Sequence, residues 1–245
     1  MVQIRRATTT AWHLGIAALL AVSVNFAMPA APVAAHCPGT VPGPPDHRDY
    51  AAGFRDLAGA ASAKGVRADI QWTNPTVCAL PGEVGWVLEA VGICNNVATC
   101  SGWVQIGWRK HDSWSNPQFY FEYQAVGGTS VQLYAPLSHV SHAYKLQYDP
   151  FDSVLDAYLD GVGKFSKGSL GFSSGSYLSA QGEVDSTHTQ IGRNAPNKLL
   201  FSDMQYQNAA GQWPALDMDA PLIIESPYGA DEPAVGQLRN WTIAH

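Results

Sequence analysis

The feature that most constrains this chain is a period-two alternation of apolar and polar residues within short segments. In residues 143–149, Tyr144, Leu146 and Tyr148 alternate with polar residues, and residues 154–160 repeat the pattern. Such alternation indicates a β-strand with one face in the core and one in water. An aspartate followed by proline or glycine closes each segment, which is typical of the turns between strands.

Similar segments recur along the chain. Further strands are expected over 66–73, 84–91, 102–109, 118–126, 178–185, 199–206 and 222–225. The alanine-rich stretch 49–63 is a candidate helix, which Gly53 and Gly59 weaken. The glycine- and serine-rich run 166–176 is expected to be a surface loop. About ten antiparallel strands predict an all-β fold, a two-sheet antiparallel β-sandwich of jelly-roll (concanavalin-like) type, with a short N-terminal helix or extended arm.

The start of the chain has the features of a secretory signal peptide. Arg5 and Arg6 precede an apolar run over 11–24, and small residues stand where a signal peptidase would cleave after Ala35. The run is shorter than the roughly 18–20 residues that a membrane span needs. We therefore expect a secreted, extracellular mature chain with no membrane span after signal cleavage.

This reasoning divides the chain into three parts. They are a signal peptide over 1–35, an N-terminal arm or short helix over 36–65, and a β-sandwich domain over 66–245. Whether 36–65 is a removable pro-segment stays open. Hydrophobic residues make up 46% of the sequence, too many for a disordered chain. The net charge of −6 comes without a basic stripe to neutralise phosphates, so no nucleic-acid partner is expected.

The four cysteines are Cys37, Cys78, Cys94 and Cys100. An even number in an exported chain indicates two disulfides, and three pairings are possible. We favour Cys94–Cys100, which closes a short loop, together with Cys37–Cys78. Paired C-x-x-C motifs are missing from the sequence, so a zinc site is not expected, and neither is another metal or a cofactor.

The strongest candidate site lies on the strands near 102–109, 118–126 and 178–185. Alternation turns one set of their side chains into the core and the other set outward. If these strands are neighbours in one curved sheet, its open face collects Trp103, Gln105, Tyr120, Glu122 and Glu183. A hollow with aromatic rings, an amide and carboxylates is a plausible ligand or catalytic site.

The motifs Gly-Trp-Val-Gln-Ile-Gly, Phe-Tyr-Phe-Glu-Tyr and Gly-Glu-Val follow one another in this order. In that order they resemble the glutamic peptidases of the eqolisin family, which are secreted jelly-roll sandwiches with a Gln–Glu dyad. The resemblance covers about 84–207 and implies Gln105 and Glu183 as the catalytic dyad. It also implies Glu122 as the acid of the middle strand. On the open face, Trp103, Tyr120 and Glu122 are the candidate substrate-binding residues.

The sequence departs from that family in two places beside the dyad. Ile106 follows the glutamine where the family has threonine, and Val184 follows the glutamate where the family has tryptophan. A second resemblance joins the Gln-x-Gly-Trp element at 105–108 to secreted actinobacterial sandwiches of concanavalin-like and neprosin-like type. This second resemblance bears on the fold more than on any activity.

Two classes of function therefore stay open. The first is an acid-active peptidase-like hydrolase that cleaves a polypeptide, with Glu183 as base and Gln105 as oxyanion donor. The second is a non-catalytic module that binds a polysaccharide or a protein, with exposed tryptophans stacking on sugar rings. A Gly-x-Ser-x-Gly match at Ser173 is a weaker rival, because no helix is expected after it.

Overall fold

The computed structural model describes residues 48–57, 62–72, 74–77, 85–137, 141–151, 154–168, 170–185, 189, 191, 200–224 and 228–242. The expected signal peptide over 1–35, Cys37 and Cys78 lie outside these ranges. Within them, every regular secondary-structure element is a β-strand. None of the described residues belongs to a helix with the length and apolar character needed to span a membrane.

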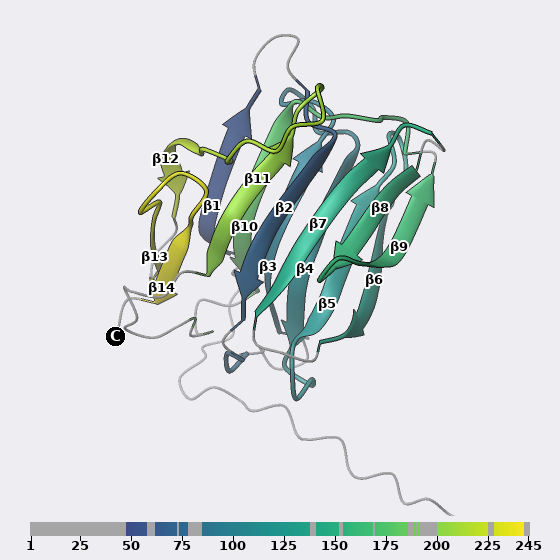
Figure 1. Ribbon diagram of the computed structural model, residues 1–245. Helices are drawn as coiled ribbons and strands as arrows, with labels where there is room; N and C mark the ends of the chain where they lie inside the picture. The colour runs from purple at the N-terminus through teal and green to yellow at the C-terminus, as the bar shows by residue number, and fades with distance from the viewer. Residues whose placement is uncertain are drawn as a thin grey trace, which may run out of the picture. The chain divides into compact units, whose positions relative to one another are not determined.

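Two large antiparallel sheets lie face to face as two layers (Figure 1). The seven-stranded sheet has the order β12 (Asp219–Ile223), β1 (Arg48–Asp56), β10 (Tyr177–Val184), β3 (Trp86–Cys94), β4 (Trp103–His111), β5 (Gln118–Gln124) and β6 (Ser130–Pro136). The five-stranded sheet has the order β11 (Phe201–Gln207), β2 (Gly65–Gln71), β7 (Ser141–Asp149), β8 (Val154–Leu159) and β9 (Val162–Gly168). A small hairpin-like sheet joins β13 (Tyr228–Asp231) to β14 (Arg239–Thr242).

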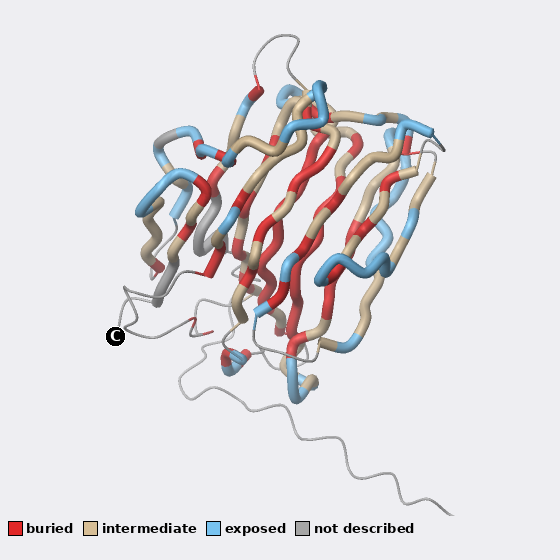
Figure 2. Tube along the Cα trace, in the orientation of Figure 1, coloured by how far each residue is buried: buried red, intermediate tan, exposed pale blue. Residues whose placement is uncertain are grey.

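The hydrophobic core fills the space between the two large sheets. Alternate residues of β8 and β10 are buried, as the period-two pattern predicts. Val91 and Ile106 from one sheet belong to the same buried cluster as Leu146 and Ala157 from the other. In Figure 2 the buried positions run along the central strands of both layers. The predicted two-sheet antiparallel β-sandwich is thus confirmed.

The N-terminal part of the described chain is a strand, not a helix. β1 pairs along its length with β10 and also pairs with β12, so both of its edges are hydrogen-bonded within the sheet. A Cβ at Gly53 would lie 2.8 Å from Cγ of Met218, so the glycine that weakens a helix here permits close packing. Residues assigned from the sequence to an N-terminal arm therefore belong to the sandwich itself.

The sequence did not predict β1 as a strand. Four further strands were also not expected: β6, β9, β13 and β14. β6 and β9 are the outermost strands of their sheets and are mostly exposed or half-buried. An edge strand buries little of either face, so its sequence carries weak alternation. The expected surface loop over 166–176 is consequently shorter, because β9 extends to Gly168.

Candidate functional site

The candidate residues meet on the face of the seven-stranded sheet that points away from the core. On β4, Gln105 pairs with Glu122 of β5 on one side and with Gly92 of β3 on the other. Gly92 in turn pairs with Ser179 of β10. One strand, β3, therefore separates Gln105 from the strand that carries Glu183, and it offers a small residue at the crossing point.

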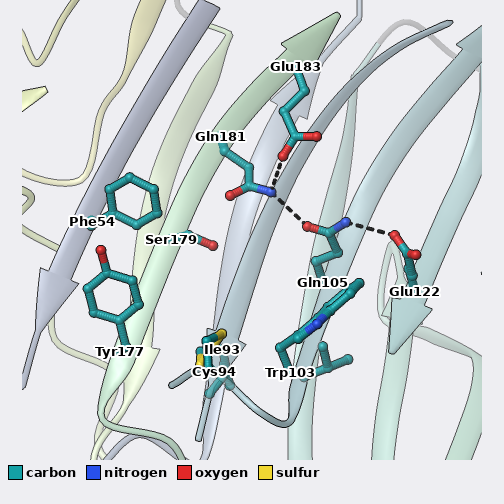
Figure 3. Close-up of a pocket in the computed structure, with 12 residues that line it drawn as sticks. Phe54, Ile93, Cys94, Trp103, Gln105, Glu122, Tyr177, Ser179, Gln181 and Glu183 are labelled. Carbon is teal, nitrogen blue, oxygen red and sulfur yellow. Dashed lines mark hydrogen bonds between the residues drawn. A yellow bond between two sulfur atoms is a disulfide. The ribbon is translucent and has the colours of Figure 1, made fainter. Parts of the chain in front are cut away.

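These strands enclose an open pocket with a volume of about 330 Å³. Its lining residues are Phe54, Ile93, Cys94, Cys100, Trp103, Val104, Gln105, Glu122, Tyr177, Ser179, Gln181 and Glu183. Figure 3 shows the polar groups of Glu183, Gln181, Gln105 and Glu122 in a row across the strands. Four of the five site residues expected from the sequence line this pocket, and Tyr120 does not.

Gln181 links the two residues of the expected dyad. Its side-chain nitrogen, Nε2, donates to Oε1 of Gln105 at 2.9 Å and to Oε1 of Glu183 at 2.7 Å (Figure 3). Because both distances start at the same nitrogen, the two oxygens lie at most about 5.6 Å apart. A single water that hydrogen-bonds to two oxygens spans about the same distance. The carboxyl of Glu183 and the amide of Gln105 thus reach one shared position.

Glu122 fixes the other end of the Gln105 amide. Nε2 of Gln105 donates to Oε2 of Glu122 at 3.0 Å and to Oη of Tyr120 at 2.9 Å. The Tyr120 hydroxyl itself donates to Oε2 of Glu122, and Gln132 donates to Oε1 at 3.0 Å. These contacts direct the nitrogen of the Gln105 amide toward Glu122 and its oxygen toward Gln181.

Tyr120 holds this network rather than lining the pocket. It is fully buried, so its ring presents no face to a ligand. The guanidinium of Arg109 covers it, with Cζ 5.7 Å from the Tyr120 ring centroid and 4.5 Å from that of Trp86. Stacking of a cation on two rings is favourable and fixes the position of this positive charge.

A neutral histidine lies next to this cation. Burial and the nearby positive charge of Arg109 lower the pKa of His111 to about 4, against a smaller opposing effect of Asp112. The His111 ring contacts that of Trp114 with centroids 4.2 Å apart, and Trp114 packs edge-on against Tyr134. Trp114 is therefore part of a neighbouring aromatic cluster and does not line the pocket.

The pocket also contains residues that the sequence did not single out. Phe54 and Tyr177 stack with their ring centroids 5.2 Å apart at one end. The same end holds the disulfide between Cys94 and Cys100, the pairing favoured from the short loop. The spacing of Gln181 two residues before Glu183 was a usable signal, because it puts both side chains on one face. The pairing of β1 with β10, which brings Phe54 here, had no such signal.

The rival sites fall elsewhere. Ser173 is exposed in the segment between β9 and β10, so the element that follows it is a strand. His142 lies on β7 and is buried, and its Nδ1 lies 2.6 Å from Oδ2 of Asp160. Among the residues with described positions, no group of three or more His, Cys, Asp or Glu side chains is arranged to hold a metal ion.

Comparisons with known proteins give structural similarity at low sequence identity. No family model and no curated protein matches the chain. A structure of scytalido-glutamic peptidase with a peptide-based transition state analog is 14% identical and covers 79% of this chain and 98% of its own, with a TM-score of 0.48. A Bacillus licheniformis β-glucanase is 11% identical over 55% of this chain and 54% of its own, with a TM-score of 0.31. The carbohydrate-binding module CBM66 from Bacillus subtilis is 13% identical over 56% and 81%, with a TM-score of 0.33. At these values the comparisons assign no function, and any assignment rests on the geometry of the site.

Proposed function

We propose that this protein is an exported hydrolase that cleaves peptide bonds in acid, with Glu183 and Gln105 as its catalytic residues. The observation that carries the proposal is that both polar groups bond to one nitrogen over an open pocket. A carboxylate that takes a proton from water and an amide N–H that donates a hydrogen bond to the oxyanion provide two functions that hydrolysis of an amide uses. The Cys94–Cys100 disulfide agrees with an oxidising compartment.

In the proposed reaction, ionised Glu183 takes a proton from a water molecule as the water oxygen attacks the scissile carbonyl carbon. The carbonyl oxygen becomes negative in the tetrahedral intermediate. One N–H of Gln105 that faces Tyr120 in this structure turns to that oxygen and stabilises it. The C–N bond then breaks, and Glu183 passes its proton to the leaving nitrogen. The products are a carboxylic acid and an amine, and Glu183 is ionised again.

The pH range follows from the base. A carboxylate acts as a base once it is ionised, and model carboxyl groups have pKa values near 4. A weak base of this kind also returns its proton readily to the leaving amine, so we expect cleavage to be measurable at about pH 4.

The test is digestion of an acid-denatured protein at about pH 4 by the mature chain. Glu183→Gln should remove cleavage, because glutamine keeps the size of the side chain but accepts no proton. Asp217→Asn is the matched control, since its side chain is 54% exposed and its ion pair with Arg55 is long, at 3.9 Å. Intact folding with no cleavage by the parent protein would refute the proposal, as would equal rates for the parent and Glu183→Gln.

One observation favours a second candidate, a non-catalytic carbohydrate-binding module. The half-buried Trp103 lines the same pocket as two amides and two carboxylates, and sugars bind where a ring face adjoins such polar groups. Retention on a polysaccharide column that is lost in Trp103→Ala, together with no cleavage in acid, would establish this candidate instead.

A further inference from the structure

We propose that the end of the pocket farther from Glu183 is a specificity subsite for a large apolar side chain, best an aromatic one, next to the cleaved bond. The inference takes its substrate class, a polypeptide, from the proposed function. It adds the chemistry that selects where the polypeptide is cut.

The pocket has two chemically different ends. Glu183, Gln181, Gln105 and Glu122 form the polar end. The other end consists of rings, aliphatic groups and sulfur: its residues are Phe54, Ile93, Cys94, Cys100, Trp103 and Tyr177. Among the residues that the structure describes, none of those lining this apolar end carries a charge. In Figure 3 the rings of Phe54 and Tyr177 stand on one side and that of Trp103 on the other.

Small residues give this end its depth. β3 presents Gly92 and β10 presents Ser179 on the floor, side by side in the register of the sheet. A Cβ at Gly92 would lie 2.9 Å from Oγ of Ser179 and 3.3 Å from Cβ of Gln105. The space above these two positions therefore exists because neither carries a large side chain. Aromatic walls on both sides suit a flat ring better than a branched polar group.

The spacing joins the apolar end to the reaction. Trp103 precedes Gln105 by two residues on β4, and Ser179 precedes Gln181 by two on β10. Two residues along a strand cover about 6.6 Å. An aromatic side chain reaches about that far from its backbone, so a peptide with its carbonyl at Gln105 places a neighbouring side chain between Trp103 and Tyr177.

Binding can be measured without turnover in Glu183→Gln, which should hold a peptide uncut. Two peptides that differ only in phenylalanine or alanine beside the cleavage position are titrated by calorimetry at about pH 4. Burial of the phenylalanine ring predicts at least a tenfold tighter Kd for that peptide. Equal Kd values for the two peptides would overturn the proposal.

A second substitution locates the effect. In the Glu183→Gln background, Ser179→Leu fills the floor and should abolish the preference for phenylalanine, while Ser179→Ala should keep it. Thermal melts verify that both variants fold. An unchanged preference in a folded Ser179→Leu variant contradicts the assignment. Displacement of the phenylalanine peptide by a β-glucan oligosaccharide would show that the apolar end binds a sugar ring, and this result would also overturn the proposal.

The outcomes separate the two proposals. If the parent protein cuts denatured protein, mass spectrometry of the products should show aromatic or large aliphatic residues enriched about tenfold at one position beside the cut. Cleavage without such enrichment removes the subsite and leaves the hydrolase. A phenylalanine preference in binding without any cleavage removes the hydrolase and leaves an apolar peptide-binding pocket.

Discussion

Gln181→Leu isolates the contribution of the residue that joins the dyad. Leucine has a similar volume but donates no hydrogen bond, so Glu183 and Gln105 each lose the contact made by Nε2 of Gln181. A hydrogen bond to a charged group contributes about 1.5–3 kcal/mol. If that energy holds Glu183 in its reactive position, kcat/KM should fall by a factor of about 10 to 150. The acid limb of the pH–rate profile should also move to higher pH, because an ionised carboxylate loses a donated N–H.

The assay is initial cleavage of a peptide over a range of pH, with denaturant unfolding of each variant as a measure of stability. Gln147→Leu is the matched control, since Gln147 lies on β7 in the other sheet and accepts a hydrogen bond from Lys145 at 3.0 Å. If Gln181 positions Glu183 and Gln105, the loss of kcat/KM and the shift of the pH–rate profile should occur in Gln181→Leu and not in Gln147→Leu. A rate within twofold of the parent protein, or an equal loss in Gln147→Leu, would refute the reasoning.

Three further predictions concern the scaffold. Trp108→Phe removes the 2.9 Å hydrogen bond to the buried Glu89 and part of a fully buried ring, and should cost about 2–4 kcal/mol in urea unfolding, so a loss below about 1 kcal/mol would contradict it. Joint replacement of Cys94 and Cys100 by serine opens a loop with a sequence separation of 6 and should lower stability by about 2 kcal/mol in the same assay; an unchanged midpoint would count against it. Because the pKa of His111 is lowered from 6.5 to about 4, the folded state binds fewer protons than the unfolded state between these values. Stability from this group is therefore present above pH 6.5 and lost as the pH falls toward 4, and His111→Gln should flatten that part of the pH–stability curve; an NMR titration midpoint near 6.5 would exclude the effect.

The sequence was most informative where a strand buries one face. The alternation around Tyr144 and Leu146 predicts β7, and both side chains are buried. In the same way, Ile106 and Trp108 point into the core and Gln105 points out of it, as the odd or even position of each residue along the strand (its parity) predicts. Alternation succeeds here because a shift of one residue would exchange the whole buried set for the outward one.

The sequence was least informative where pairing between distant strands decides the structure. The stretch 49–63, which contains most of β1, is rich in alanine, so its composition is compatible with a helix despite Gly53. Its strand form is stabilised by β10 and β12, which lie more than a hundred residues further along the chain. Local propensity contains no information about such partners, and the Phe54–Tyr177 wall of the pocket depends on them.

The candidate site shows the same division between parity and strand order. Parity correctly puts Gln105, Glu122 and Glu183 on one face, but it does not say which strands are neighbours. β10 comes more than eighty residues after β3 begins and still pairs beside it, so Glu183 approaches Gln105 across an intervening strand. Adjacent strands lie about 4.8 Å apart, and two side chains separated by a third strand are therefore too distant for a direct hydrogen bond unless something spans the gap. Here the gap is spanned because the middle strand carries only the small residues Ala90, opposite Gln181, and Gly92, opposite Gln105, and the long amide of Gln181 reaches across them. Alternation and the family resemblance select Gln105 and Glu183, and the strand order adds Gln181, which bonds to both of them. The first experiment measures the effect of removing that linking residue.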